Sequence, residues 1–381
     1  MNIPSVAIYM ICFTLSATFC YLADCELDNP KNKKSTFIVL VLISITIPCI
    51  LAACRDVSVG TDIRTYLYPD FLTAKYDNYD FARFNHLQPV QTELLFSLLV
   101  FACGKIGSLG LLMFIIEVLV LAPLYCALFK MREYNNVTLG LVLFFLLFYN
   151  FSLSGMRQSI AMSFIALAFI QLTEKKYLTA ICLSLIAFNF HSSAILIAIL
   201  LLGCNIVLES KYYRGWNVVL IAGLTIVFFA FSILHGPLVK IVGIVSSRYV
   251  FYLNKYMSGG GINLSDIPAT DLIVKTSLVL ITWIALNATN RYEKEDNKYF
   301  ALCMIGRFFV LFNSVFYESM RIAFYFDLFI ILFVPRIYKT IDKNRSSYAL
   351  TTGILILLAL TYWGFFTMHN GAYGTNYYLL R

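Results

Sequence analysis

Long apolar runs constrain this chain more than any other feature of its sequence. They recur from one end to the other, and most approach the about 20 residues that an α-helix needs to cross a bilayer. The chain is 60% hydrophobic and only 13% charged, whereas an ordinary soluble domain is about 25% charged. We therefore expect an all-α, polytopic integral membrane protein, in which residues 1–381 form a single membrane domain without a soluble catalytic domain.

The apolar runs predict about 12 transmembrane helices. They cover residues 4–22, 36–54, 108–129, 137–152, 157–173, 178–190, 192–208, 217–235, 269–288, 299–317, 321–338 and 348–367. The sixth and seventh are separated because residues 189–193, Asn-Phe-His-Ser-Ser, are unfavourable in the middle of a membrane. Residues 92–103 are apolar but too few to cross, so we expect a half-inserted or interfacial helix there.

Basic residues predict the orientation. More than half of the 29 lysines and arginines lie in six short corners, at residues 25–35, 130–136, 174–177, 209–215, 291–298 and 336–345. Short loops rich in these residues stay in the cytoplasm, which leaves both termini and the long loops 55–91 and 236–268 outside. The net charge of +8 is thus explained partly by the cytoplasmic corners and partly by outer basic residues, which we expect to bind an anion. We expect no nucleic acid as a partner.

Arg157 and His191 stand at the two ends of a predicted membrane hairpin, where ionisable groups are costly and functional candidates. Arg157 opens a helix on the outer side, so its five donors and the free helix N–H groups suit a phosphate or diphosphate; the alternative is snorkelling to lipid head groups. His191 is a candidate general base or a residue that orients the acceptor. Its alternative role is to break one helix and cap the next with Ser192 or Ser193.

Further polar residues accompany them. Asp56, Asp62 and Glu93 are outer carboxylates that fit glycosyl chemistry or a hydrated divalent ion, with solvated loop residues as the alternative. The outer loops are rich in tyrosine, which suits either a carbohydrate cleft or an interfacial aromatic belt.

Three more charged residues lie inside predicted spans: Arg307, Asp327 and Glu117. We expect each of them to pair or to line a cavity. Arg321 opens a late helix with Tyr325 one turn inward on the same face.

Six short motifs occur in one order along the chain. They are Arg55…Gly60-Thr61-Asp62-x-x-x-Tyr66, Glu93-Leu94-Leu95-Phe96-x-Leu98-Leu99, Arg157-Gln158-x-Ile160-Ala161, Phe190-His191-x-Ser193-Ala194, Arg248-Tyr249-x-x-Tyr252 and Arg321-x-x-x-Tyr325-Phe326. In this order the chain resembles the EpsG family, the Wzy-like bacterial polysaccharide polymerases. Leu94 departs from the family pattern, which has proline there.

The resemblance implies a GT-C-like membrane glycosyltransferase of the bacterial cytoplasmic membrane. It would make exopolysaccharide, capsule or O-antigen by transferring a growing glycan from undecaprenyl diphosphate to the next lipid-linked repeat unit on the outer face. The implied partners are undecaprenyl-diphosphate-linked oligosaccharide, membrane lipid, and a chain-length regulator and flippase of the same pathway. No cofactor and no metal is implied.

The resemblance also implies roles for the motif residues. His191, Asp62 or Glu93 would take the acceptor proton, with His191 ranked first. The diphosphate would be held by Arg157, Arg321, Arg248 and Arg55, and the glycan by Gln158, Tyr66, Tyr249, Tyr252 and Tyr325. Two alternatives remain: a glycan ligase of the same fold, or a flippase or exporter of lipid-linked oligosaccharide, which would need charged groups along a path through both leaflets.

Overall fold

Helices make up nearly all of the chain that the structure, a computed structural model, describes. The described residues are 3–28, 34–88, 92–209, 267–314 and 319–380. Within them, pairing between extended segments is limited to one bridge, between Arg55 and Leu380, so the all-α prediction is confirmed. The predicted span 217–235 and nearly all of the predicted loop 236–268 lie outside the described residues.

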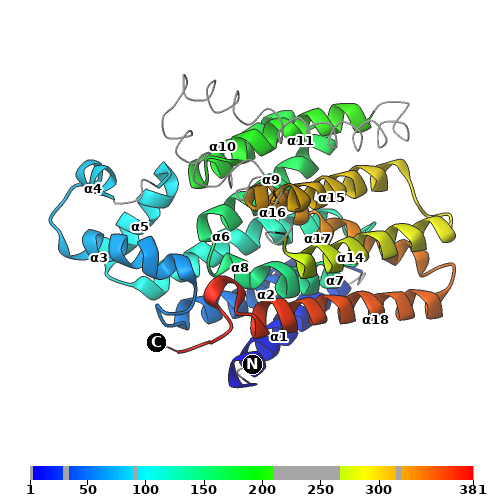
Figure 1. The fold of residues 1–381 in the computed structure, drawn as a ribbon, viewed down its shortest axis with the longest axis horizontal. Coiled ribbons are helices and arrows are strands. Elements are labelled where there is room, and N and C mark those ends of the chain that lie inside the picture. The colour runs from blue at the N-terminus through cyan, green and yellow to red at the C-terminus, as the bar shows by residue number, and fades with distance from the viewer. Residues whose placement is uncertain (1–2, 29–33, 89–91, 210–266, 315–318, 381) are drawn as a thin grey trace.

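Six helices in this part of the chain are long and apolar enough to cross a membrane. They are α1 (Ile3–Leu27), α2 (Lys34–Cys54), α6 (Leu109–Lys130), α9 (Met156–Thr173), α14 (Ala269–Ala288) and α18 (Arg345–Tyr362), which continues into the π-helical turns η5 (Trp363–His369). Figure 1 shows α14, α15 and α18 running side by side across the molecule. The chain is therefore a multi-pass membrane protein by length and composition.

Further helices occupy other predicted spans. They are α7 (Val137–Phe144), which continues through η2 (Phe145–Tyr149) and α8 (Asn150–Ser152), then α10 (Tyr177–Phe190), α11 (Ala194–Leu208) and α15 (Lys294–Phe312). The 14 residues of α10 extend about 21 Å at the usual helical rise, which is less than the about 30 Å of a bilayer core. The predicted count of twelve spans is therefore not confirmed.

The predicted span 321–338 is not one continuous α-helix. It is divided into α16 (Ser319–Asp327), α17 (Ile330–Phe333) and the 3₁₀ turns η4 (Val334–Thr340). The N–H groups of Phe329 and Ile331 bond only three residues back, which winds the chain more tightly just after Asp327.

The predicted outer loop 55–91 folds into short helices: η1 (Ile63–Leu67), α3 (Tyr68–Tyr76) and α4 (Phe81–Leu87). The apolar run that follows forms α5 (Leu94–Ile106), whose 13 residues are too few to cross. Lys105 near its end donates to the carbonyl oxygen of Asp77 at 2.8 Å, and Gly110 at the start of α6 approaches Ala53 at the end of α2. Glu93, directly before α5, bonds Arg157 at the start of α9, so both ends of α5 lie at the same end of the bundle, as a half-inserted helix requires. Figure 1 shows α3, α4 and α5 together on the side of the molecule where the C-terminus lies.

The predicted cytoplasmic corners meet one another. Arg132 bonds the carboxylate of Asp24 at 3.0 Å, which joins the corner after α6 to the end of α1. Lys130 pairs with Glu174 at 3.0 Å, which adds the corner between α9 and α10. These contacts place three of the six corners at one end of the helices.

The remaining corners join the same end. Lys298 pairs with Glu209 at 3.1 Å, which joins the start of α15 to the end of α11. Lys339 pairs with Glu293 at 2.8 Å and brings in the corner after η4. The N–H of Asn136 donates to the carbonyl of Pro335 and connects the two groups of corners. This arrangement supports the predicted alternation of the helices, including the separation of α10 from α11.

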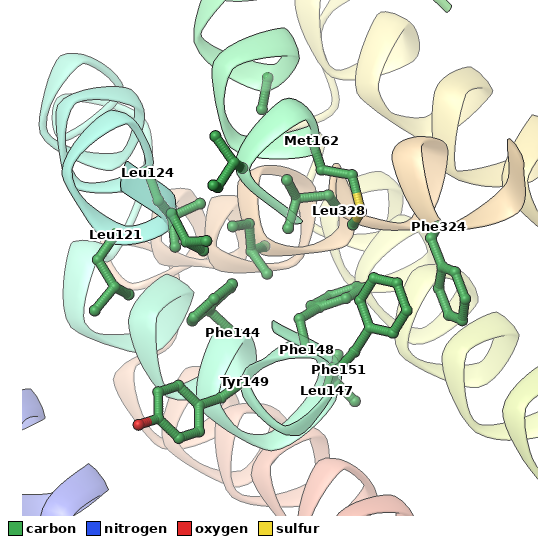
Figure 2. Close-up of a cluster of buried hydrophobic side chains, with 14 of the residues drawn as sticks. Leu121, Leu124, Phe144, Leu147, Phe148, Tyr149, Phe151, Met162, Phe324 and Leu328 are labelled. Atoms are coloured by element: carbon green, nitrogen blue, oxygen red, sulfur yellow. The ribbon is translucent and has the colours of Figure 1, made fainter. Parts of the chain in front are cut away.

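Aromatic residues of the 137–152 segment fill the centre of the bundle (Figure 2). Phe144, Phe148 and Phe151 are all at least nine-tenths buried. Phe151 stacks on Phe324 of α16 with ring centroids 4.3 Å apart, and Figure 2 shows Met162 of α9 above the same rings. Because this segment is enclosed by helices from both halves of the chain, it fixes α16 relative to α9.

The positions of Thr65 and Glu133 test this arrangement, because both are exposed and lie at opposite ends of the helices. We would introduce Thr65→Cys or Glu133→Cys into a chain whose exposed cysteines, Cys25, Cys54, Cys126 and Cys182, are alanine. A membrane-impermeant maleimide should label position 65 in intact spheroplasts and position 133 only after permeabilisation. Equal labelling of both positions from outside would contradict the predicted topology.

Candidate functional site

Arg157 forms the centre of a polar cluster at the end of the bundle opposite the basic corners. It lies in the first turn of α9, where the preceding Gly155 ends a tight turn. Its Nη1 donates to Oε2 of Glu93 at 2.8 Å, and the other oxygen of Glu93 accepts from the backbone N–H of Ser192 at 2.8 Å. One carboxylate thus joins the start of α5, the start of α9 and the corner between α10 and α11.

His191 lies at that corner beside two hydroxyl groups. Its Nδ1 is 2.7 Å from Oγ of Ser193, and Ser193 donates to the phenol oxygen of Tyr325 at 3.1 Å. The Tyr325 oxygen is also 3.4 Å from Nδ1 of His191. Since Nδ1 is engaged in this way, Nε2 remains without a hydrogen-bond partner in the described residues.

Arg321 and Gln158 meet where α16 begins. Nε2 of Gln158 donates to the carbonyl oxygen of Arg321 at 2.6 Å. The Arg321 charge opposes the effect of burial on the pKa of Asp62 and adds to the effect of burial on the pKa of His191. Two arginines from distant parts of the sequence therefore act on the same small region.

Asp62 and Tyr66 form the side contributed by the predicted outer loop. The Tyr66 hydroxyl donates to Oδ2 of Asp62 at 3.2 Å. The Arg157 guanidinium lies over the Tyr66 ring, 4.9 Å from its centroid, and 6.0 Å from that of Phe96. A cation over an aromatic face is attracted by the ring quadrupole, so Tyr66 holds Arg157 in place while it also orients Asp62.

Close backbone packing positions Asp62. Gly60 has a φ of +100°, and a Cβ there would lie 2.7 Å from the carbonyl oxygen of Leu153, so only glycine fits. The next residue, Thr61, shares a 2.6 Å hydrogen bond with Ser154. The Gly60 N–H donates to the carbonyl of Gly374 at 2.9 Å, so the C-terminal segment covers this turn.

Burial and neighbouring charges together set the pKa values of the ionisable groups in the site. Burial raises the pKa of Asp62, although Tyr66, Arg157 and Arg321 act in the opposite direction. Burial would also raise the pKa of Glu93, but Arg157 and the Ser192 N–H hold it below its ordinary value. For His191, burial together with Arg157 and Arg321 lowers the pKa to about 4, against the influence of Glu93. At neutral pH the imidazole is therefore neutral and able to accept a proton.

The structure places Arg55 apart from these groups. It is only 1% exposed, and its Nη2 contacts the sulfur of Met156 at 3.7 Å. Its guanidinium lies in the core near Glu117 and Tyr149. The structure therefore does not bring Arg55 into the polar cluster, and its assignment to the diphosphate stays a prediction. Arg248, Tyr249 and Tyr252 lie outside the described residues.

Of the predicted site residues, eight come together: Asp62, Tyr66, Glu93, Arg157, Gln158, His191, Arg321 and Tyr325. Two further residues, which were not among the predicted site residues, support the cluster: Ser193 links His191 to Tyr325, and Gly374 accepts from the Gly60 N–H. Ser193 belongs to a motif and was available as a candidate. Gly374 carries no sequence signal, because its contact with Gly60 depends on tertiary packing.

A comparison with protein-family models matches residues 7–380 to a family described as the EpsG family. The comparisons with curated proteins and with solved structures give no match. The match extends over nearly the whole chain, so it includes every residue of the polar cluster.

Gly60→Ala tests the packing that positions Asp62. The added methyl group would meet the carbonyl of Leu153 in a backbone conformation that alanine rarely adopts, and such strain costs about 1–3 kcal/mol. We expect a lower melting temperature for the purified protein in detergent. Gly203→Ala is the matched control, because a Cβ there has nothing within 4 Å. A Gly60→Ala variant that melts like the control would contradict the proposed close approach.

Proposed function

Because the chain belongs to the EpsG family, a family of membrane proteins of polysaccharide biosynthesis, we propose that it is a polysaccharide polymerase. It would transfer a growing glycan from undecaprenyl diphosphate to the next lipid-linked repeat unit, on the outer face of the bacterial cytoplasmic membrane. The observation that carries this proposal is the convergence of Arg157, Arg321, His191 and Glu93 at the end of the bundle opposite the basic corners.

The two arginines suit the diphosphate of the donor. Arg157 presents a guanidinium beside the free N–H groups at the start of α9, and Arg321 occupies the first turn of α16. Guanidinium groups bind phosphate oxygens through paired donors. Charge that develops on the departing undecaprenyl diphosphate would thus be stabilised by groups already held in place.

His191 is the preferred group to receive the acceptor proton. In the reaction, a hydroxyl oxygen of the incoming unit attacks the anomeric carbon of the growing glycan. The bond from that carbon to the diphosphate oxygen breaks, its electron pair leaves with the lipid diphosphate, and the hydroxyl proton passes to Nε2 of His191. Ser193 and Tyr325 hold Nδ1, which directs Nε2 away from them. Asp62, with its raised pKa, is the second candidate.

Two tyrosines and one glutamine within the cluster are the proposed contacts of the sugar. Tyr66 packs on Arg157, Gln158 bonds the backbone of Arg321 and Tyr325 bonds Ser193, and we place the glycan beside these three side chains. Tyr249, Tyr252 and Arg248, which lie outside the described residues, remain proposed contributors from the outer loop. The proposed pathway partners are a flippase and a chain-length regulator, as the resemblance to Wzy-like polymerases implies.

Substitutions at the cluster test the proposal. Arg157→Ala, His191→Ala and Arg321→Ala should each lower polymer formation by about a hundred-fold or more, the usual effect of removing a group that stabilises developing charge. Single repeat units should accumulate on the lipid at normal protein levels, as measured by gel separation of lipid-linked glycans. Arg83→Ala is the control, because Arg83 is an exposed cation stacked on Tyr79 outside the cluster.

The same strains separate the alternatives. Single units that fail to reach the outer face would support a flippase or exporter, whereas long lipid-linked chains that are never passed to a final acceptor would support a ligase. Wild-type glycan length in Arg157→Ala and His191→Ala would refute the assigned site.

The lowered pKa of His191, about 4, sets the pH dependence. An imidazole with this pKa stays neutral as the pH falls through 6.5, the ordinary pKa of histidine. It becomes protonated, and can no longer act as a base, only near pH 4. We expect the transfer rate of protein in liposomes to be maintained from pH 8 to about pH 5 and to decline below it. An acid limb centred near pH 6.5 that disappears in His191→Gln would contradict a partly buried, neutral imidazole.

A further inference from the structure

Four charged side chains form a second buried cluster beneath the site. Asp271 and Lys275 come from α14, Arg307 from α15 and Asp327 from the end of α16, and each is at most 2% exposed. Lys275 pairs with Asp271 at 2.5 Å and with Asp327 at 3.2 Å. Arg307 pairs with Asp271 at 2.9 Å and also contacts Asp327. We call these four residues the charge cluster.

The charge cluster is electrically balanced. Its two cations each contact both carboxylates, and the Tyr362 hydroxyl of α18 adds a hydrogen bond to Asp271 at 2.9 Å. Removing one member would leave a buried charge without a partner, which is strongly unfavourable. The cluster therefore holds α14, α15, α16 and α18 in a single arrangement.

One short helix connects this cluster to the candidate site. α16 has nine residues, with Arg321 and Tyr325 facing the site and Asp327 in the charge cluster. Asp327 is six residues beyond Arg321, about 9 Å along a helix. The chain winds more tightly directly after Asp327, which interrupts the α-helical hydrogen bonding there. The ion pairs of Asp327 therefore fix α16 at its C-terminal end, where the helix does not continue.

Gly306 shows how closely α15 and α16 approach each other here. A Cβ at position 306 would lie 2.4 Å from Oδ1 of Asp327 and 3.2 Å from its backbone nitrogen. A methyl group there would have to displace Asp327 without changing any charge. The position of Asp327 thus depends on both ion pairing and the absence of a side chain at 306.

We propose that the charge cluster is the positioning anchor of the site: through Asp327 it sets the depth and rotation of α16, and with them the places of Arg321 and Tyr325. Asp327 and Lys275 are positioning residues in this proposal, since neither touches the groups of the site that contact the substrate. The inference rests on the proposed function in that Arg321 is taken to bind the lipid diphosphate.

Two variants disturb the anchor in different ways. Lys275→Met with Asp327→Asn removes one charge of each sign and leaves the Arg307–Asp271 pair intact. Gly306→Ala leaves every charge and displaces Asp327 by volume alone. The control is Arg336→Met with Asp296→Asn, which removes one buried charge of each sign at the other end of α15, where the basic corners meet. It also removes the contact of Lys339 with Asp296, so it disturbs at least as many ion pairs there as the anchor variants do.

Each protein would be purified in detergent and measured for melting temperature, for binding of undecaprenyl diphosphate, and for polymer formation in liposomes. Both anchor variants should bind undecaprenyl diphosphate at least about ten-fold more weakly and lose about a hundred-fold in transfer rate, because misplacement of about 1 Å has effects of this size. They should melt no lower than the control variant, which should bind and polymerise like the unaltered protein.

Arg157→Ala, measured beside them, separates the two proposals. If Arg157→Ala loses binding and transfer while both anchor variants keep them, the anchor is refuted and the proposed function stands. If Arg157→Ala keeps them, the proposed function is refuted. Equal losses in the anchor variants and in the Arg336/Asp296 control would also refute the anchor, because the effect would then be that of any buried ion pair.

Discussion

The bridge made by Glu93 is the interaction on which the candidate site depends. Its carboxylate accepts from Arg157 and from the Ser192 N–H, each at 2.8 Å, and so joins the start of α5, the start of α9 and the corner between α10 and α11 at this end of the bundle. In the apolar surroundings of a membrane protein, charged groups without partners are costly. Mutual satisfaction of Glu93 and Arg157 therefore allows both to stand beside His191 without a ligand, and the cluster is organised in advance of binding.

The charged groups discussed above form three sets, which lie at different depths along the helices. Exposed ion pairs such as Lys130–Glu174 and Lys339–Glu293 gather at one end, the candidate site occupies the other, and the charge cluster lies between them, surrounded by apolar residues. Surface pairs contribute little to stability, so the first group chiefly marks the orientation. The buried four-charge cluster has a different role, because its geometry is shared by four helices. The aromatic core around Phe148 and Phe151 occupies the remaining space.

Sequence reasoning was most successful where periodic apolar runs or charged corners carried the information. The helical class, the break at His191 and the shared side of the basic corners were all predictable, because membrane thickness and charge placement act locally along the chain. The internal winding of residues 319–340 was not predictable, since the hydrogen bonds that reach only three residues back after Asp327 leave no mark on the apolar pattern of the sequence. Asp271 and Lys275, four residues apart in an apolar helix, were an available signal that went unused. That the Arg55 side chain turns into the core could not be predicted, because its position shortly before Gly60-Thr61-Asp62 says nothing about the direction of its side chain.

The C-terminal segment has a consequence for the order in which the protein is made. The Gly374 carbonyl covers Gly60, and the Tyr9 hydroxyl donates to Thr375, a residue 366 positions later in the sequence. When α9 with Arg157 has entered the membrane, the C-terminal segment that covers Gly60-Thr61-Asp62 has not yet been synthesised. The site is therefore completed only after the last transmembrane helix of this region, α18, has entered the bilayer. A partly synthesised chain would then lack the completed polar cluster.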